Sequence, residues 1–234
     1  MAKLKIGVLI SGRGSNLKAL IDACAAEDFP AEIVRVIANV TGAGGLAYAE
    51  EAGIPWQMID HRAFRDREGF EDTLHRALKD AGVELICLAG FMRLLTESFV
   101  NRWWDRLINI HPSLLPAFRG LHTHERVLEY GARFTGCTVH FVRPAMDDGP
   151  IIVQAVVPVA VDDTAEALAA RVLREEHIIY PLAVRMVAEQ RVRVVQDRVI
   201  VQGAGTPRGA LVSPTLHRVG PSKTPNHTQS ARAR

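Results

Sequence analysis

An asparagine and a histidine stand between apolar residues in the segment 107–116, which reads LINIHPSLLP. Side chains alternate between the two faces of a strand, so Asn109 and His111 are expected to point to the same face. Pro112 cannot donate a ladder hydrogen bond, which predicts that the pair lies at the carboxyl end of the strand. Buried polar groups are costly unless they are hydrogen-bonded, so the two residues form either a satisfied structural pair or a functional site.

These side chain types suit the activation of a carbonyl group. An asparagine amide and a histidine N–H can both donate to an oxyanion, and each such donor typically contributes about 10²–10³ in rate. Asp147 lies in MDDGP (146–150), where Asp and Gly are also common for turn geometry alone. A carboxylate beside His111 would keep the imidazole protonated near neutral pH. No serine or cysteine nucleophile has an evident place here, and Ser113 is interpreted as part of a turn, so direct acyl transfer between two bound substrates is favoured.

A glycine-rich loop, SGRGSN (11–16), is expected between the first strand and the first helix. Ligands bind at this place in open α/β sheets. Gly12 and Gly14 permit unusual backbone angles and the close approach of an anion, while Ser15 or Asn16 can cap the helix. The free N–H groups of the first helical turn would form a phosphate site. A tight turn that binds no ligand is the alternative.

The loop differs from two common nucleotide-binding motifs. The third glycine position of a dinucleotide fingerprint holds Leu17, and the second strand ends at Ala38-Asn39 with no acid to bind a ribose. The lysine and hydroxyl residue of a P-loop are also missing. A single phosphate on a small ligand therefore fits the loop better than a dinucleotide.

Short apolar segments alternate with helical patterns up to residue 111. This alternation, with apolar strands covered on both faces, predicts an α/β fold with a mostly parallel sheet flanked by helices, Rossmann-like in its N-terminal half. The expected strands lie at 4–10, 33–37, 54–59, 83–90 and 107–111, and the expected helices lie after residue 16, near 44–52, at 67–81 and at 96–104.

The pattern changes after residue 120. Only six residues separate the expected strands 136–143 and 150–160, too few for a crossover helix, so the pair should form an antiparallel hairpin. Asp163 and Glu166 resemble a capping box at the start of a helix that reaches about residue 190, and Pro181 should kink or divide this helix. Further elements are a helix at 123–130 and a small final hairpin at 191–202.

The composition is that of an ordinary globular protein, with 234 residues, 48% of them hydrophobic and 23% charged. Removing the five basic residues of segment 203–234, which has no Asp or Glu, turns the formal net charge of +2 into −3 for residues 1–202. The chain is thus not expected to bind nucleic acid. We expect one domain over residues 1–202 and a disordered tail over 203–234, which is rich in Gly, Pro, Ser and Thr.

The sequence also bears on location and on metal binding. It has no apolar run long enough to span a bilayer and no signal-peptide cleavage pattern, which predicts a cytoplasmic protein with no membrane partner. The three cysteines (Cys24, Cys87 and Cys137) are widely spaced, as expected of reduced core thiols. Their spacing is not that of a zinc site, and we expect no metal.

Several segments together resemble the folate-dependent glycinamide ribonucleotide (GAR) formyltransferases of purine biosynthesis. The resemblance is collinear and extends over roughly residues 4–200. The segments are LISGRGSNL (9–17), LAGFMRLL (88–95), INIHPSLLPAFRGLHTH (108–124), GCTVHFV (136–142), DDGPIIVQ (147–154) and EEHIIYP (175–181).

This resemblance implies an activity and a set of residue roles. The GAR amine would attack the formyl carbon of the co-substrate 10-formyltetrahydrofolate, with Asn109 and protonated His111 stabilising the oxyanion and Asp147 holding His111 charged. The implied GAR-binding residues are Gly14, Ser15, Asn16 and Glu176. The implied folate-binding residues are Arg67, Met92, Arg93, Leu94, Leu95, Asn109, Arg143, Pro144, Ala145, Met146 and Asp147.

The sequence departs from the family pattern at two positions. Leu173 stands where some relatives carry a polar substrate contact, which puts one ribose interaction in doubt. Asp148 stands where a second glycine is common, and we expect its carboxylate to face solvent. The other histidines in the matching segments are expected to be structural or exposed rather than catalytic, namely His122, His124, His140 and His177.

Other functions share parts of this pattern. Formyltetrahydrofolate deformylases and methionyl-tRNA formyltransferases resemble the same Asn–His–Asp core, but the SGRGSN loop favours a phosphorylated acceptor. A deformylase would be expected to carry an N-terminal regulatory domain, and a tRNA enzyme a basic C-terminal domain. A non-catalytic folate- or nucleotide-binding module and a dinucleotide oxidoreductase are less favoured. The expected partners are the two small substrates, with the protein a monomer or a homodimer.

Overall fold

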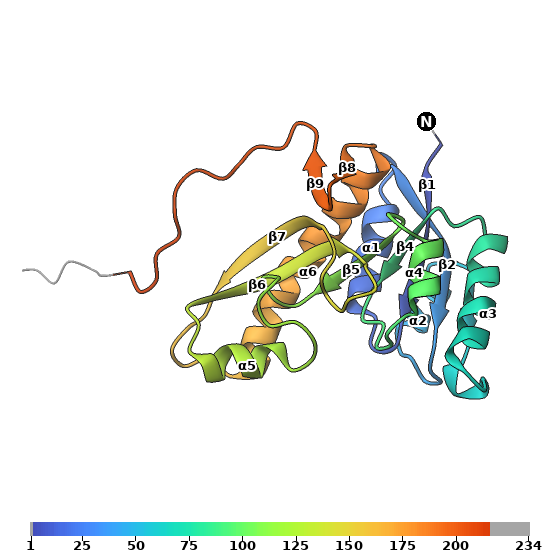
Figure 1. Cartoon of the computed structure of the whole chain (residues 1–234), viewed down its shortest axis with the longest axis horizontal. Coiled ribbons are helices and arrows are strands. Elements are labelled where there is room, and N and C mark those ends of the chain that lie inside the picture. The colour runs from blue at the N-terminus through green and yellow to red at the C-terminus, as the bar shows by residue number, and fades with distance from the viewer. Residues whose placement is uncertain (1, 216–234) are drawn as a thin grey trace, which may run out of the picture.

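The computed structural model describes residues 2–215. Seven of its strands form one sheet, in the order β3-β2-β1-β4-β5-β6-β7 (Figure 1). The strands are β1 (Leu4–Ile10), β2 (Ala31–Ala38), β3 (Trp56–Met58), β4 (Leu85–Leu88), β5 (Leu107–His111), β6 (Phe134–Phe141) and β7 (Ile151–Pro158). The α-helices are α1 (Ser15–Cys24), α2 (Leu46–Glu51), α3 (Arg67–Asp80), α4 (Glu97–Arg102), α5 (Thr123–Tyr130) and α6 (Ala165–Ala188), and His61–Ala63 forms a 3₁₀ turn.

The sheet changes character at β5. Strands β1 to β5 pair in parallel, whereas β6 runs antiparallel to β5 and β7 antiparallel to β6. The predicted α/β class, the mostly parallel sheet and the antiparallel hairpin are therefore confirmed. The hairpin follows from its short connection, since parallel strands need a crossover of a dozen or more residues.

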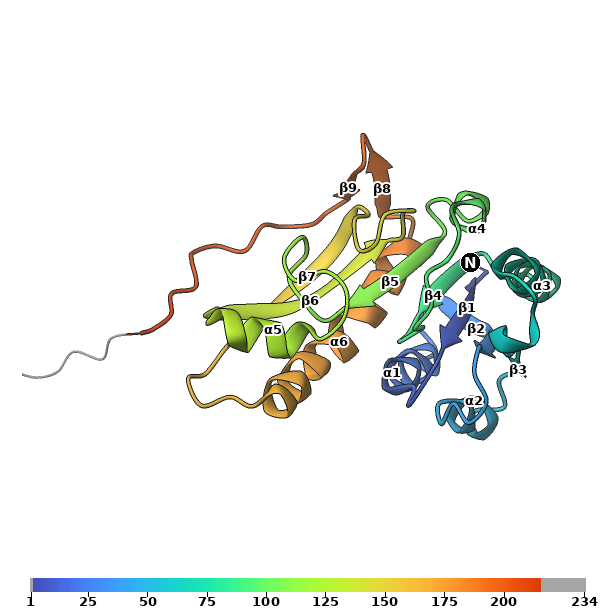
Figure 2. The ribbon, with the colours of Figure 1, turned by 60° about the horizontal axis from the view of Figure 1, so that its bottom comes forward.

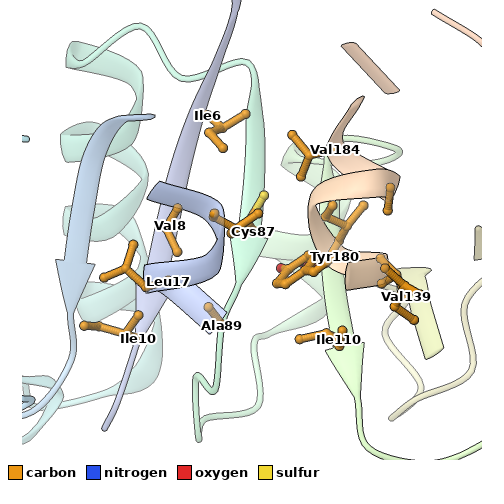
Figure 3. Close-up of a cluster of buried hydrophobic side chains, with 14 of the residues drawn as sticks. Ile6, Val8, Ile10, Leu17, Cys87, Ala89, Ile110, Val139, Tyr180 and Val184 are labelled. Carbon is orange, nitrogen blue, oxygen red and sulfur yellow. The ribbon is translucent and has the colours of Figure 1, made fainter. Parts of the chain in front are cut away.

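Helices cover both faces of the sheet (Figure 2). The alternation of side chains along β1 shows why, because Val8 packs on one face with residues of α1 and α6, while Leu9 packs on the other with residues of α3 and α4. Figure 3 shows the first of these two cores, where Leu17 of α1 and Tyr180 of α6 meet residues of the strands. The sheet is thus a rigid platform on which the loops at its edges can be held.

Two details of α6 differ from the sequence-based prediction. The helix is capped by Thr164, whose hydroxyl accepts a hydrogen bond from the Ala167 N–H at 3.2 Å, and not by Asp163. The Asp163 carboxylate instead accepts from Arg171, at 2.7 and 2.8 Å, which leaves the capping role to the next residue. Pro181 does not divide the helix, which runs unbroken for 24 residues.

A second, two-stranded antiparallel sheet follows α6, as predicted. It consists of β8 (Val192–Val195) and β9 (Arg198–Val201), and residues 203–215 beyond it contain no helix or strand. The rest of the segment expected to form a disordered tail, residues 216–234, lies outside the described residues. Among the helices of the described chain, none is both long and apolar enough to cross a membrane.

Candidate active site

Strand β5 carries Asn109 and His111 at the carboxyl end of the parallel sheet, where the sequence predicted them. In the antiparallel register with β6, Asn109 lies directly opposite His140, and His111 lies opposite Thr138. His111 is buried and Asn109 is half-buried. Asn109 therefore has a polar neighbour on β6, whereas the polar contacts of His111 come from the Phe118 carbonyl and Asp147.

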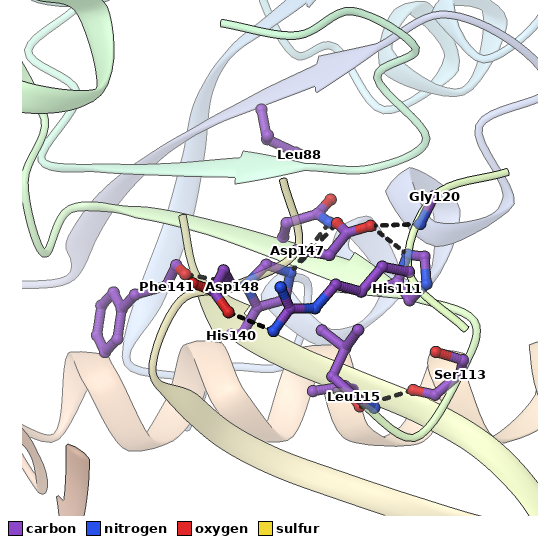
Figure 4. Close-up of polar contacts among 12 residues, drawn as sticks. Leu88, His111, Ser113, Leu115, Gly120, His140, Phe141, Asp147 and Asp148 are labelled. Carbon is purple, nitrogen blue, oxygen red and sulfur yellow. Dashed lines mark hydrogen bonds and ion pairs between the residues drawn. The ribbon is translucent and has the colours of Figure 1, made fainter. Parts of the chain in front are cut away.

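His140 orients the Asn109 amide. Its Nδ1–H donates to the Phe141 carbonyl at 2.9 Å, and its Nε2 lies 3.3 Å from the Asn109 amide nitrogen (Figure 4). Burial lowers the pKa of His140, which favours the neutral ring. Neutral His140 with its proton on Nδ1 accepts a hydrogen bond at Nε2, so one amide N–H of Asn109 is taken and the other is free to donate.

His111 is held between two acceptors. Its Nδ1 lies 3.4 Å from Oδ2 of Asp147, and its Nε2 lies 3.0 Å from the Phe118 carbonyl oxygen. Because both ring nitrogens face oxygen acceptors, the doubly protonated imidazolium satisfies both contacts, whereas a neutral ring leaves one unmade. The predicted contact between His111 and Asp147 is thus present.

Asp147 lies in the turn between β6 and β7 and is strained. Its φ is +51°, an uncommon angle for a residue other than glycine. The Gly120 N–H donates to its Oδ2 at 2.9 Å, so the 112–122 loop and His111 converge on the same carboxylate (Figure 4). Oδ1 lies 3.9 Å from Nε2 of His140, but neutral His140 carries no proton there, so we do not count this approach as an ion pair. Asp148 is exposed, as expected, and pairs with Arg119.

A buried hydroxyl holds the loop that follows β5. Thr138 donates to the Ser113 carbonyl at 2.7 Å and accepts from the Leu115 N–H at 3.1 Å. The Ser113 hydroxyl donates to the Ala117 carbonyl at 2.6 Å. Ser113 is therefore part of the turn, in agreement with its interpretation from the sequence, and its hydroxyl is not aimed at His111.

The glycine loop leads into α1 with backbone rather than side chain groups. Gly14 is the N-cap residue with φ +75°, and no side chain of the described residues caps this helix, so the predicted capping by Ser15 or Asn16 is wrong. A Cβ on Gly14 would lie 2.5 Å from the Cα of Gly45, which leaves room only for glycine. The first N–H groups of α1 are consequently left for a ligand.

Asn16 and Glu176 join this loop to α6. The Asn16 amide donates to Oε2 of Glu176 at 2.7 Å, and Glu176 is 7% exposed. Burial raises the pKa of Glu176, an effect that the bond from Asn16 partly offsets. The buried Oδ1 of Asn16 has no hydrogen-bond partner within the described part of the chain. The pair is an incomplete polar network, as expected of residues that contact a polar ligand.

The residues assigned to the folate pocket by resemblance lie on separate elements. Arg67 begins α3, Met92 and Leu94 are exposed in the loop after β4, and the Arg93 guanidinium lies 5.3 Å from the Phe70 ring centroid. Met92 and Leu94 are thus not core residues, and Leu95 packs partly against the second core. In the 143–147 turn, Pro144, Ala145 and Met146 are exposed, while the guanidinium of Arg143 is buried against Asp105 and Asp197.

Sequence reasoning missed three residues near the site. His140 was not expected to contact Asn109, and its role depends on the β5–β6 register. Ser11 and Asn39 link the two binding loops, because the Ser11 hydroxyl donates to Oδ1 of Asn39 at 2.6 Å and accepts from the Met92 N–H at 2.8 Å. A serine and an asparagine at the ends of neighbouring parallel strands were the available signal.

Known proteins share much of this sequence. Residues 4–184 match the family model described as formyl transferase. The chain is 50% identical over 192 residues to the trifunctional purine biosynthetic protein adenosine-3 of Gallus gallus, covering 82% of this chain and only 19% of that protein's length. It is 41% identical over 209 residues to the phosphoribosylglycinamide formyltransferase of Haemophilus influenzae, covering 89% of this chain and 99% of that protein.

A solved structure shows the same architecture. Glycinamide ribonucleotide transformylase 1 from Symbiobacterium toebii superposes with a TM-score of 0.83 and 45% identity, covering 85% of this chain and 94% of that one. Together with the family match over residues 4–184, this similarity leads to one conclusion. The chain belongs to the formyl transferase family.

Proposed function

We propose that the chain transfers the formyl group of 10-formyltetrahydrofolate to the glycyl amine of GAR, giving formyl-GAR and tetrahydrofolate. The observation that carries the proposal is the position of His111 between Asp147 and the Phe118 carbonyl, beside an Asn109 amide with one free N–H. The similarity to phosphoribosylglycinamide formyltransferases and to a GAR transformylase supports this choice of acceptor.

In this reaction the residues of β5 act on the formyl oxygen. When the amine nitrogen bonds to the formyl carbon, negative charge develops on that oxygen, and the amide of Asn109 and the positive charge of the His111 imidazolium would stabilise it. For His111 to donate to this oxygen directly, its Nε2–H has to leave the Phe118 carbonyl. Preorganised donors of this kind stabilise the transition state more than the ground state, which raises kcat. His140 contributes indirectly by fixing the Asn109 amide.

Asp147 has two tasks in the proposal. It keeps His111 protonated, and it assists the movement of the proton that the attacking amine loses and that the departing folate nitrogen gains. The bond from the Gly120 N–H holds the carboxylate for both tasks. These steps use side chains of the chain itself and need no metal ion.

The glycine loop and α6 are proposed to bind GAR. Backbone N–H groups at Gly14, Ser15 and Asn16 would hold the phosphate, because the start of a helix attracts anions. Glu176 would accept from the amine or the ribose, and the unpartnered Oδ1 of Asn16 is a second acceptor beside it. Leu173 supplies no polar group, so one ribose contact of some relatives is not part of this proposal.

Exposed apolar side chains fit a flat co-substrate. Met92, Leu94 and Met146 are at least half exposed, which is unusual for large apolar residues unless a ligand covers them. With Arg67, Arg93, Leu95 and the backbone of residues 143–147, they form the proposed folate-binding set. The proposal also includes a cytoplasmic location and a monomer or a homodimer.

One experiment tests the reaction. Purified protein is mixed with 10-formyltetrahydrofolate in the presence and absence of GAR, and both tetrahydrofolate and formyl-GAR are followed. We expect turnover that depends on GAR, with one formyl-GAR formed for each tetrahydrofolate. Loss of the formyl group without GAR would support a deformylase instead, and no reaction in either tube would contradict the proposal.

A further inference from the structure

The turn that carries Asp147 begins far from the histidine that Asp147 contacts. Phe141, the last residue of β6, pairs with Ile108, which lies three residues before His111. Three residues of a strand span about 10 Å. The 143–149 turn must therefore fold back over the sheet to bring Asp147 within 3.4 Å of His111. The φ of +51° at Asp147 is part of this path, and such an angle persists only where the surroundings hold it.

Arg143 fixes the start of this turn. Its side chain is 6% exposed, and it donates to Asp105 at 2.7 Å, to Asp197 at 3.2 Å and to the Val142 carbonyl at 3.2 Å. The centre of the guanidinium lies 3.9 Å from the Trp104 ring centroid, within the distance of a cation–π contact. Each of the three guanidinium nitrogens thus donates to one of these acceptors, which holds the side chain in one position.

The two acidic partners are themselves held in unusual conformations. Asp105 precedes β5 and has φ +54°, and Asp197 lies in the β8–β9 turn and has φ +58°. The angle at Asp197 belongs to the two-residue turn between Val195 and Arg198, in which Gln196 also has a positive φ, so Arg143 is not needed to explain it. Asp105, between α4 and β5, holds its uncommon angle with its carboxylate on the Arg143 guanidinium. Asp197 also lies beyond residue 184, where the match to the family model ends. The final hairpin thus reaches the turn that carries Asp147.

We propose that Arg143 is a positioning residue: the Arg143–Asp105–Asp197 cluster anchors the 143–149 turn so that Asp147 stays against His111. The role of this cluster in catalysis rests on the function proposed above. Through Asp197, the proposal gives the β8–β9 hairpin a positioning role in the reaction, although this hairpin carries none of the candidate catalytic residues. It also gives the Arg143 side chain a role other than direct folate contact.

The test compares substitutions in the cluster. Arg143→Gln removes all the ionic contacts, and we expect kcat to fall about 10- to 100-fold, the loss typical of a misplacement of about 1 Å. Asp197→Gly removes a partner whose side chain is 70% exposed, and we expect a decrease of about 2- to 5-fold, in line with the weakness of exposed ion pairs. Gln196→Gly is the matched control, because Gln196 has φ +48° in the same turn but is exposed and makes no hydrogen bond to Arg143 in the described chain. Its kcat should equal that of the wild type.

Two further readouts separate positioning from a general loss of stability. The KM for GAR should stay unchanged in Arg143→Gln, because the glycine loop lies on the other half of the sheet. The ¹⁵N chemical shift of Nδ1 of His111, measured by NMR on the full chain without substrates, should change because Asp147 no longer faces it. Arg143→Lys, which keeps the charge, should recover part of both kcat and the chemical shift.

The outcomes distinguish this proposal from the proposed function. If the wild type does not formylate GAR but Arg143→Gln still changes the His111 chemical shift, the function is wrong and the anchor stands. If the wild type is active and Arg143→Gln leaves both kcat and the chemical shift unchanged, the anchor is wrong. A lower melting temperature with an unchanged chemical shift and an unchanged rate per folded molecule would also overturn it.

Discussion

In the parallel half of the sheet, β1–β4, the site is built mainly from backbone, whereas in the β5–β7 half it is built from side chains. The glycine loop after β1 offers N–H groups and excludes a Cβ at Gly14. The β5–β6 pair instead places the Asn109 amide against the His140 imidazole through its register, and β5 also carries His111. The difference suggests that one half binds and the other half reacts, so substitutions should separate into effects on KM and effects on kcat.

The two kinds of connection account for this difference. In a parallel sheet, each strand ends where a helix begins, so the edge presents helix N-termini that attract anions. In an antiparallel pair, opposite residues lie about 4.5–5.5 Å apart, so polar side chains on neighbouring strands can bond directly. Asn109 and His140 are such a pair.

The largest effect should come from Asp147→Asn. This change keeps the shape of the side chain but removes the negative charge that faces His111 at 3.4 Å, so we expect the fold to be kept and kcat to fall about 10²- to 10⁴-fold, the range for general acid–base groups. The pH dependence of turnover should change as well. Asp148→Asn is the control, because Asp148 pairs with exposed Arg119, and its rate should stay within about 2-fold as for surface charges. An unchanged rate and pH profile in Asp147→Asn would reject the role of Asp147.

Asn109→Ala should follow, with kcat lowered about 10²- to 10³-fold by the loss of one oxyanion donor. Asn109→Asp has nearly the same size but cannot donate, so it should lose activity to a similar extent. Steady-state kinetics with GAR varied would check that KM for GAR is unchanged. A large rise in that KM with an unchanged kcat would contradict the division of the sheet into a binding and a reacting half.

Gly14→Ala tests the other half. The added Cβ meets the Gly45 backbone, and φ +75° is unfavourable for alanine, so the loop has to shift. Strain of about 1–3 kcal/mol is typical for such a position. We expect KM for GAR to rise about 10-fold, which corresponds to about 1.4 kcal/mol, while kcat changes less. At Gly12 a Cβ would meet nothing within 4 Å, so Gly12→Ala should have a much smaller effect. Equal effects of the two substitutions would show that the close approach of Gly45 is unimportant.

The sequence predicted those features that depend on local patterns. The alternation of strands and helices, the placement of Asn109 and His111 at the end of β5, and the hairpin with its short turn all follow from spacing along the chain. The prediction that Asp163 caps α6 was wrong, because the adjacent Thr164 can also accept from the helix N-terminus and is the residue that does so.

The sequence alone could not predict features that depend on contacts between distant residues. The contact between Asn109 and His140 requires the register of β5 against β6, two strands that residues 112–133 separate along the chain. The bond between Asn16 and Glu176 joins residues 160 positions apart. Their residue types were visible in the sequence, but no local pattern brings them together. The capping role assigned to Asn16 was wrong for a different reason, since α1 already begins at Ser15 with Gly14 as its N-cap.

The smallest effect concerns Glu176, which links the two halves through Asn16. Because burial raises the pKa of Glu176 above its ordinary value of 4.5, the folded protein binds more protons than the unfolded chain in the interval between the two values. The stability that this group contributes is present below pH 4.5 and is lost as the pH rises through the raised value.

Glu176→Gln keeps an acceptor for Asn16 without the charge. Its melting temperature should therefore exceed that of the wild type at neutral pH, by about 2–4 °C for each kcal/mol in a domain of this size. The difference should vanish near pH 4, and thermal unfolding at both pH values checks it, with Glu175→Gln on the more exposed neighbouring position as the control. A stabilised variant with weaker GAR binding would show that the link between the halves is kept for binding at the expense of stability, whereas a less stable variant at neutral pH would show that the charged pair itself holds the halves together.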